Sequence, residues 1–218
     1  MPNNQESATA ELDHCLGNED EFSRCEVFIN VSNRFLGLLA SDASRSSIND
    51  TSLEYPFVAM DSRQVFRQLA LVRRHLGLGR EQTQGATPAP PTFLDVGCGI
   101  GNVMLLAEQM GFDAYGLEKD RDPCAMARRL FDRDRVSDAD IWEYRHYHRF
   151  QVIYYFRPFA DRKLQQEFER MIEERMQPGS LLIANHKNTV DITADARFSQ
   201  LHPELPVWRK RTNCSAPL

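Results

Sequence analysis

The sequence lacks the cysteine pattern of a disulfide framework or of a zinc site. Five cysteines are scattered along the chain, an odd number, and no two of them have the C-x-x-C spacing. Both kinds of site depend on paired or closely spaced thiols, so neither is indicated. The pattern is typical of reduced thiols, and we expect a cytoplasmic protein. The cysteines are Cys15, Cys25, Cys98, Cys124 and Cys214.

The chain also has no excess of positive charge. The chain has 26 Lys and Arg against 31 Asp and Glu, which gives a formal net charge of -5. Proteins that bind duplexes usually carry a basic stripe, so nucleic acid is a less favoured partner. One local exception is Arg209-Lys210-Arg211, which we interpret as a solvated tail.

Signals for membranes and for metals are missing as well. The polar, acidic segment MPNNQESATAELDHCLGNEDE has neither the basic nor the apolar part of a signal peptide. No apolar run has the length of a transmembrane helix, so we expect no membrane partner. His146 and His148 have no carboxylate or cysteine at ligand spacing, and we predict no metal site.

What the first 85 residues do have is helical patterning. We predict disorder for residues 1–20 and an amphipathic helix between about Asp20 and Ala40, followed by a polar loop. A second helix begins at Asp61, with Gln64 as its capping-box partner, and ends at Gly77. Residues 1–85 are therefore predicted to form a helical N-terminal extension that caps the site. The linker EQTQGATPAPP separates it from the next unit.

Residues 92–218 alternate between strand and helix patterns. The strands are TFLDVG, DAYGLE, FQVIYYF and SLLIAN, and helices are predicted over 102–110, 122–131 and 161–176. This order predicts an α/β domain with a mostly parallel, twisted sheet flanked by helices. Another strand is hard to place within the charged segment 132–139. After SLLIAN only LPVWRK suggests a strand, so we expect a sheet shortened at its C-terminal edge. A shortened edge would either leave the substrate side more open or call for a partner chain, such as a second copy.

The segment FLDVGCGIGN, residues 93–102, holds three glycines directly after the first strand. Glycines there permit positive φ and let a ligand approach the backbone. The dinucleotide fingerprint needs its third glycine at position 102, where the chain has Asn102. Asp95 also precedes the loop, and a carboxylate suits a cationic nucleoside better than a pyrophosphate. An NAD-type oxidoreductase is therefore the less favoured alternative.

These residues resemble motif I of the class I S-adenosylmethionine (SAM)-dependent methyltransferases. The resemblance extends to Glu118 at the end of the next strand, where the family has a carboxylate that holds both ribose hydroxyls. It implies SAM as the cofactor and a SAM-binding, Rossmann-like domain over residues 92–218. The implied cofactor-binding residues are Asp95, Gly97, Cys98, Gly99, Gly101, Asn102, Glu118, Lys119, Asp140 and Ile141.

The adenine contact implied by the resemblance falls in V-S-D-A-D-I-W-E-Y. Asp138 or Asp140 would supply the acid, and Ile141 or Trp142 the apolar neighbour. Asp140-Ile141-Trp142 fits better, because Trp142 is then able to lie on the purine. A helix start with a core tryptophan explains the same residues equally well.

The segment after FQVIYYF, Arg157-Pro158-Phe159, occupies the place of the family's motif IV. Methyltransferases that act on exocyclic amino groups of bases, or on glutamine amides, often have Asn or Asp, two prolines and an aromatic residue there, and this chain departs from that pattern. Arg157 either clamps an anionic substrate or is solvated at the strand end. Candidate catalytic residues are Tyr154 (or its neighbour Tyr155), Arg157 and His186, and the sequence leaves open whether a general base is used.

The resemblance implies a methyl transfer by in-line displacement, in which positioning supplies much of the rate. We expect a small-molecule or protein acceptor, because the chain is acidic and departs from the motif IV pattern. A non-catalytic SAM-binding module is the alternative, since motif I implies only that the cofactor binds. Tyr55-Pro56-Phe57 resembles segments that fold over the cofactor in some methyltransferases.

Overall fold

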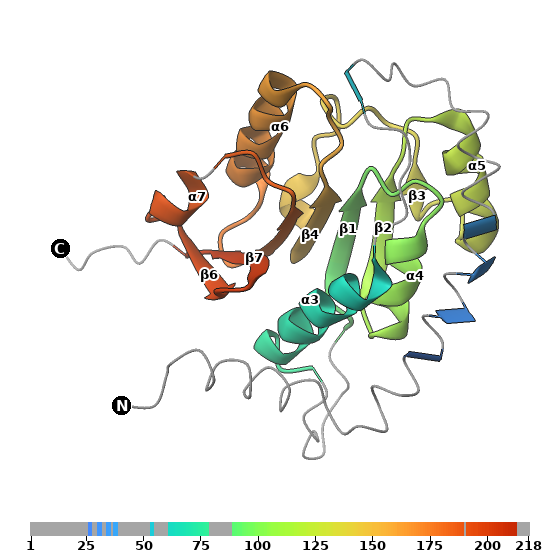
Figure 1. The fold of residues 1–218 in the computed structure, drawn as a ribbon, viewed down its shortest axis with the longest axis horizontal. Coiled ribbons are helices and arrows are strands. Elements are labelled where there is room, and N and C mark those ends of the chain that lie inside the picture. Colours follow the sequence, from blue (N-terminus) through green and yellow to red (C-terminus); the bar gives the residue numbers. More distant parts are fainter. Residues whose placement is uncertain are drawn as a thin grey trace.

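The computed structural model describes residues 26–27, 30–31, 34–35, 37–38, 53–54, 61–78, 89–189 and 191–212 (Figure 1). The helices are α3 (Ser62–His75), α4 (Asn102–Gln109), α5 (Arg121–Leu130), α6 (Arg162–Arg175), the short α7 (Asp191–Ala194) and the 3-10 turn η1 (Tyr147–Arg149). The strands are β1 (Thr92–Val96), β2 (Asp113–Leu117), β3 (Val136–Ser137), β4 (Val152–Phe156), β5 (Leu181–Asn185), β6 (Phe198–His202) and β7 (Leu205–Lys210).

The described residues between 26 and 38 are helical, as predicted. The predictions for residues 1–20, for Tyr55-Pro56-Phe57 and for most of the linker lie outside the described residues. The charged segment 132–139 forms only the two-residue strand β3, paired with β2. Because β3 has only two residues, the segment carries no strand pattern that could be recognised in the sequence.

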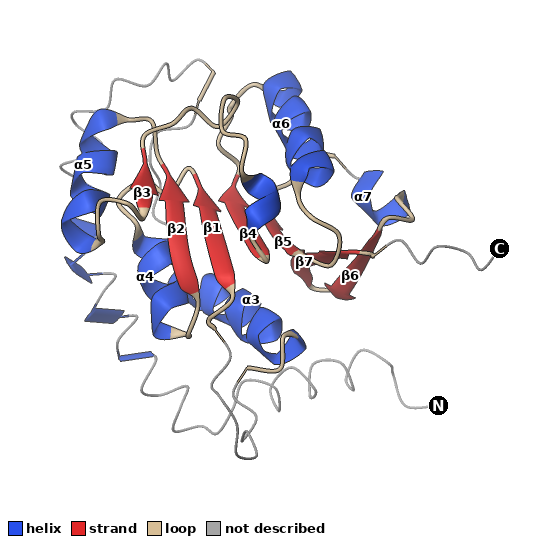
Figure 2. Cartoon of the chain, turned by 180° about the vertical axis from the view of Figure 1, so that it is seen from behind, coloured by secondary structure: helices blue, strands red, loops and turns tan. Residues whose placement is uncertain are grey.

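The strands form one sheet in the order β3-β2-β1-β4-β5-β7-β6, which Figure 2 shows from behind. The first five are parallel, and β7 runs antiparallel to both β5 and β6. The predicted α/β class with a mostly parallel sheet is confirmed. Parallel strands place their carboxyl ends at one edge, where such sheets bind ligands.

Helices cover both faces of the sheet because successive side chains of a buried strand point to opposite sides. Phe93, Val152 and Tyr154 join the core shared with α3, α4 and α5. Leu94 and Ile153 join the second core, which holds side chains of α6 and α7. Helices α3 and α4 lie on the near side of the sheet in Figure 1.

Helix α3 is part of this core, although the sequence analysis assigned it to an N-terminal extension. Val65, Phe66, Leu69 and Val72 are each at most 3% exposed and pack with side chains of β1, β4 and β5. Asp61 caps the helix, since its side chain accepts a hydrogen bond from the Arg63 N–H at 2.9 Å. The apolar face predicted from the sequence is thus the face that covers the sheet.

The C-terminal edge of the sheet is complete, and the expected shortening is wrong. LPVWRK forms β7 as predicted, but β6 lies beyond it at the edge. Most of the side chains of β6 are partly or fully exposed, so the strand carries no apolar run to predict it. The argument for a partner chain at this edge therefore loses its basis.

The basic segment near the C-terminus is also not a solvated tail. Arg209 and Lys210 belong to β7, and the Lys210 side chain is buried. Its Nζ donates to the carbonyl oxygens of Glu173, Glu174 and Met176, at 2.7, 3.0 and 2.8 Å, and so caps the end of α6.

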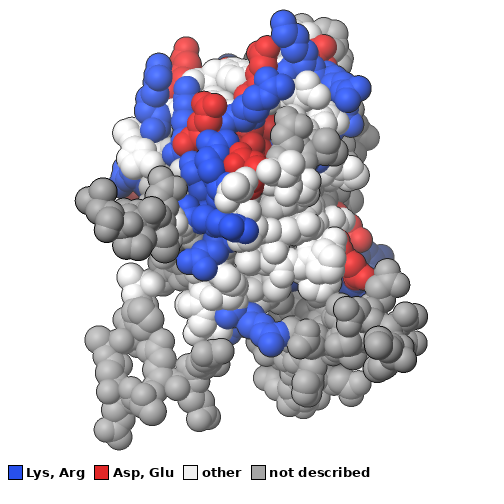
Figure 3. Space-filling view, turned by 90° about the vertical axis from the view of Figure 1, so that its left-hand side faces the viewer, with Lys and Arg blue, Asp and Glu red and all other residues white. Residues whose placement is uncertain are grey.

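Figure 3 shows the side of the molecule where α7 and the edge strand β6 lie. Lys and Arg side chains alternate with Asp and Glu side chains over its upper part. In the described part of the chain, no helix combines the length and the hydrophobicity needed to cross a bilayer.

Candidate functional site

The glycine loop joins β1 to α4 at the carboxyl edge of the sheet. Gly97, Gly99 and Gly101 have φ values of 78°, 55° and 87°, a region that favours glycine. Among the described residues, a Cβ atom on Gly97 would meet only Pro158, at 4.0 Å, so they leave the space above this backbone open. A Cβ atom on Gly101 would lie 2.6 Å from the Phe131 ring. The first glycine thus admits a ligand, and the third lets α4 pack beside α5.

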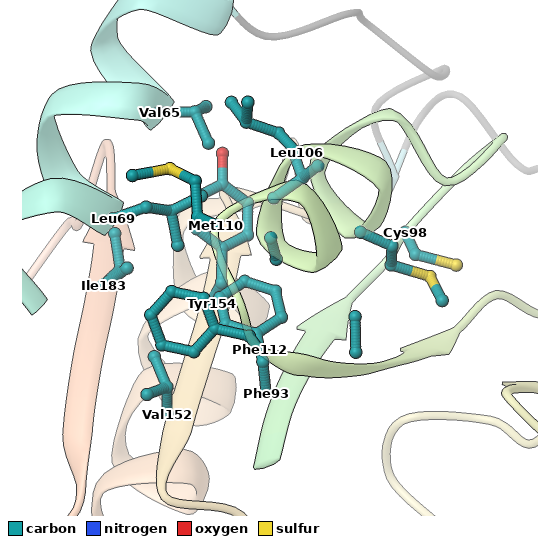
Figure 4. Packing of buried hydrophobic residues seen from close by; sticks show 14 of the residues in the cluster. Val65, Leu69, Phe93, Cys98, Leu106, Met110, Phe112, Val152, Tyr154 and Ile183 are labelled. Atoms are coloured by element: carbon teal, nitrogen blue, oxygen red, sulfur yellow. The ribbon is translucent and has the colours of Figure 1, made fainter. Parts of the chain in front are cut away.

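Cys98 points away from this open space. Its thiol packs beneath the loop, where a Cβ atom on Gly116 would lie 2.5 Å from both the Cys98 and the Met104 sulfurs. Burial raises the pKa of the Cys98 thiol well above its usual value, with further contributions from Asp95 and Glu118. Figure 4 shows the side chain within the core. The predicted cofactor contact of this residue is therefore left to its backbone.

Glu118 holds the glycine loop against the end of β2. Its Oε2 accepts the Gly99 N–H at 2.9 Å, and its Oε1 accepts the Asp120 N–H at 2.8 Å. Burial raises the pKa of Glu118 to about 7, against the opposing effect of these two N–H groups. Each carboxylate oxygen has a further lone pair, so Glu118 is able to accept two more hydrogen bonds.

Asp95 is the second-to-last residue of β1, just before the loop, and is 2% exposed. Burial, and then the charge of Glu118, raise the pKa of the Asp95 carboxyl well above its usual value. Within the described residues its Oδ2 has no hydrogen-bond partner. A cationic group placed above the loop would relieve this repulsion.

On the other side of Glu118 lies the predicted adenine region. Lys119 pairs with Glu54 and lies 3.8 Å from Asp140. Asp140 also accepts the Trp142 N–H, at 2.8 Å, in a turn. Asp138 faces α5 instead and pairs with Arg128 at 3.3 Å. Of the two candidate acids, Asp140 is therefore the one beside the site.

Trp142 is half-buried and packs against the core. Its ring centroid lies 5.4 Å from that of Phe159 and 6.4 Å from that of Phe168. Ile141 is half-buried on the same core, and its carbonyl accepts the Tyr147 hydroxyl at 2.6 Å. Trp142 therefore contacts the core from a turn rather than from a helix start, and its contact with a purine stays a prediction.

A short part of the N-terminal segment reaches the same edge. The Leu53 carbonyl accepts the Ala160 N–H at 2.8 Å, and Glu54 forms a β-bridge with Phe159. The Glu54 carboxylate bonds to Lys119. Glu54 thus connects the loop after β4 with the loop after β2, on the two sides of β1.

Tyr154 and Tyr155 are poorly placed to accept a proton. Tyr154 lies beside Asp95 on β4, and Figure 4 shows its ring among side chains of α3 and α4. Burial raises its pKa well above the usual value, and the charge of Asp95 adds to the shift. Tyr155 is buried on the opposite face, and burial likewise raises its pKa. Both phenols therefore stay protonated near neutral pH.

Asn185 is a site residue that the sequence analysis missed. It ends β5, is 1% exposed, and its Oδ1 accepts the amide groups of Gln64 and Gln68 at 3.1 and 2.6 Å. Gln64 therefore reaches Asn185, and the structure shows no capping box with Asp61. The two glutamines are one helical turn apart on α3, a polar pair beside its apolar face, and that was the available signal.

Arg157 and His186 follow the neighbouring strands β4 and β5. Among the described residues they are the non-glycine residues with positive φ, at 22° and 53°. The Arg157 N–H donates to the Asn185 carbonyl at 3.3 Å. His186 is exposed, and its ring packs edge-on against Phe156 with centroids 5.0 Å apart. Strained backbone of this kind is concentrated at functional sites.

The described residues contain no group of three or more His, Cys, Asp or Glu side chains placed to hold a metal ion. His146 and His148 lie in or beside η1, before β4, with ring centroids 6.2 Å apart. They are at the amino end of that strand and therefore distant from the glycine loop.

No protein-family model matches the sequence, and no curated protein matches it. Solved structures match by fold. The sugar N-methyltransferase KedS8 from Streptoalloteichus is 20% identical, with 56% of this chain and 46% of that chain covered and a TM-score of 0.42. An RNA methyltransferase from Salinibacter ruber, in complex with S-adenosylhomocysteine, is 19% identical, with 73% and 97% covered and a TM-score of 0.49.

A SAM-dependent methyltransferase from Geobacter sulfurreducens is 16% identical, with 57% of this chain and 48% of that chain covered and a TM-score of 0.41. This chain thus spans less than half of the Geobacter protein and of KedS8. At such identities the likeness concerns the fold alone. The strand order β3-β2-β1-β4-β5-β7-β6 with an antiparallel β7 is itself the class I methyltransferase topology.

Proposed function

We propose that this chain, whose sheet has the class I methyltransferase topology, is a SAM-dependent methyltransferase. The observation that carries the proposal is an open glycine loop between two carboxylates, one of them buried and the other half-buried. Gly97 leaves room for a ligand, Asp95 lies below the loop, and Glu118 lies beside it. A dinucleotide pyrophosphate at the loop would meet repulsion from Asp95, whereas a cationic nucleoside is attracted by it.

The residues present fit this cofactor. Glu118 has lone pairs left for two ribose hydroxyls, in the bidentate manner that suits a carboxylate. Asp95 and the backbone at Gly97 and Gly99 would face the charged methionine part. Asp140 and Ile141 would lie toward the adenine. Bound SAM supplies an electrophilic methyl group on a sulfonium.

The strand order supports an acceptor site at the ends of β4 and β5. Glu118 follows β2, and the order β2-β1-β4-β5 then directs the rest of the cofactor toward β4 and β5. Arg157 and His186 stand at those two strand ends and are our candidates for contact with an acceptor. The net charge of -5 and the departure from the motif IV pattern favour a small molecule or a protein over nucleic acid.

Isothermal titration with SAM, S-adenosylhomocysteine and NAD tests the cofactor. We expect binding of the first two and none of NAD. Methyl transfer from labelled SAM into separated small-molecule, protein and RNA fractions of a cell extract tests the reaction. Binding without any labelled product would point to a regulatory SAM-binding module. Binding of NAD alone would overturn the proposal.

A further inference from the structure

His186 stands between two residues that are anchored on opposite faces of the sheet. Asn185, before it, is bound by Gln64 and Gln68 of α3. Lys187, after it, reaches α6 on the other face, with its side chain 6% exposed. The exposed imidazole between them extends from the carboxyl end of β5.

The anchor on the α6 side is a buried ionic cluster. Lys187 Nζ lies 3.1 Å from a Glu169 carboxylate oxygen and 2.5 Å from a Glu173 carboxylate oxygen. Glu169 also accepts the Asn188 N–H at 2.7 Å and the Thr189 N–H at 2.8 Å. The Thr189 hydroxyl donates to the same carboxylate at 2.7 Å. The loop that follows His186 is therefore bound to a single fully buried side chain.

These contacts explain how His186 keeps its strained backbone. A left-handed conformation at a non-glycine residue is energetically unfavourable and persists only where the surroundings impose it. Here hydrogen bonds and ion pairs to α3 and α6 fix both neighbours. A solvated surface histidine does not require neighbours that are fixed in this way, whereas a side chain that must be held in one orientation does.

The fold fixes which direction that is. His186 follows β5, next to the end of β4, and its ring contacts Phe156 at that end. Because Glu118 marks the ribose side at β2, β4 and β5 border the opposite end of the crevice. The imidazole is thus presented toward the side from which an acceptor would approach.

We propose that His186 lies beside the transferred methyl and contacts the methyl acceptor, and that Glu169 and Lys187 are its positioning residues. This inference rests on the proposed function. It assigns to His186 an acceptor-binding role, and it assigns to the buried cluster on α6 the task of orienting that side chain.

Histidine modification by diethyl pyrocarbonate, followed residue by residue with peptide mass spectrometry, tests the proposal. Sinefungin is the probe, because its amine replaces the methyl-bearing sulfonium. We expect saturating sinefungin to slow the modification of His186 severalfold. His146 and His148, at the opposite edge of the sheet, serve as internal controls and should react at an unchanged rate.

Two variants test the positioning residues. Glu169→Gln and the milder Thr189→Val should reduce the protection of His186 by sinefungin while leaving sinefungin affinity nearly unchanged. Glu167→Gln, on the exposed side of the same helix, is the matched control and should behave as the wild type. If Glu169→Gln does not fold, Thr189→Val and the wild-type measurement still decide the question.

The outcomes separate the two proposals. If sinefungin does not bind in a titration, the proposed function fails and this inference fails with it. If sinefungin binds but His186 reacts at the same rate with and without it, the inference alone is overturned. Protection that survives in both variants would remove the positioning role and leave the contact.

Discussion

Glu118 illustrates how one side chain serves both the loop and a ligand. Its two oxygens already accept N–H groups from Gly99 and Asp120, so the loop is held in place before any cofactor binds. The lone pairs that remain point to further donors. A carboxylate that is shared in this way should be sensitive both to substitution and to pH.

Replacing Glu118 by glutamine should weaken S-adenosylhomocysteine binding about 10- to 100-fold, since hydrogen bonds to a charged group contribute about 1.5–3 kcal/mol. The amide would also turn one acceptor into a donor against a backbone N–H. Isothermal titration gives the affinity. Glu143→Gln, an exposed acid in the loop after β3, is the control and should bind like the wild type. Equal affinity of both variants would contradict a ribose contact.

The raised pKa of Glu118 predicts that cofactor affinity depends on pH. Burial raises its pKa to about 7, and the carboxylate is the form that accepts ribose hydroxyls. Affinity should therefore rise with pH up to about 7, by at most about tenfold per pH unit, and then level off. Titrations at several pH values should show this rise in the wild type and a flatter profile in Glu118→Gln.

The stability of the free protein should change in the opposite sense. The unfolded-state pKa of a glutamate is about 4.3, below the folded value, so the unfolded chain ionises first. The contribution of Glu118 is therefore full below about pH 4.3 and is lost as the pH rises through about 7. Urea unfolding over this range measures how the difference in unfolding free energy between wild type and Glu118→Gln changes with pH. If the pKa of Glu118 is not raised in the folded protein, that difference should not fall as the pH rises.

At the scale of elements, the start of α4 depends on a glycine for two reasons. Gly101 has φ 87° and also lies against the Phe131 ring. Gly111, after the same helix, has the same φ, but a Cβ atom there would meet none of the described residues within 4 Å. Comparing the same substitution at Gly101 and at Gly111 therefore separates the cost of backbone strain from the cost of close packing.

Gly111→Ala should destabilise the protein by about 1–2 kcal/mol, the cost of a left-handed alanine. Gly101→Ala should lose about 1–3 kcal/mol more, because Phe131 must move out of a packed position. Urea denaturation of both variants gives the comparison. Equal losses would mean that the ring accommodates the methyl group freely and that conformation alone requires the glycine.

Helix α3 is attached to β5 by buried amides as well as by its apolar face. Gln68 donates to Asn185 at 2.6 Å and accepts from it at 3.3 Å. Gln68→Met keeps the length of the side chain but leaves the Asn185 amide without this partner, which should cost about 1–3 kcal/mol. Gln109→Met, on the exposed end of α4, should change the unfolding free energy little, and an equal loss there would rule out the amide explanation.

At the scale of the whole molecule, the sheet domain extends upstream of the proline-rich linker. Val65, Phe66, Leu69 and Val72 together contribute on the order of 6–12 kcal/mol of burial free energy. That is comparable with the total stability of a typical domain, about 5–15 kcal/mol. A boundary placed at the linker would therefore divide a single core.

Two truncated chains test this statement. A chain that begins at Asp61 should unfold cooperatively, whereas one that begins at Ala89 should lack a cooperative transition. Circular dichroism and near-UV spectra during thermal unfolding distinguish them. Cooperative unfolding of the shorter chain would show that α3 is dispensable and that the linker is a true domain boundary.

The sequence by itself determined the alternation of strands and helices, the α/β class and the place of the glycine loop. These follow from local patterns: buried parallel strands are short apolar runs, and the turn after β1 needs glycines wherever it occurs. Asp95 and Glu118 could be found because each ends a recognisable strand. The weak β3 and the polar edge strand β6 could not, since neither carries an apolar run.

Only the tertiary structure decided which distant residues meet. Gln64 and Gln68 reach Asn185, Lys187 reaches Glu169, and the basic segment near the C-terminus caps α6. No spacing along the chain announces such pairs, because a buried polar side chain is satisfied by whatever partner the packing brings near it. The same packing placed the Cys98 side chain in the core and the Trp142 ring against it. Residue type therefore indicated the chemistry of the site, and the direction of each side chain was settled by the fold.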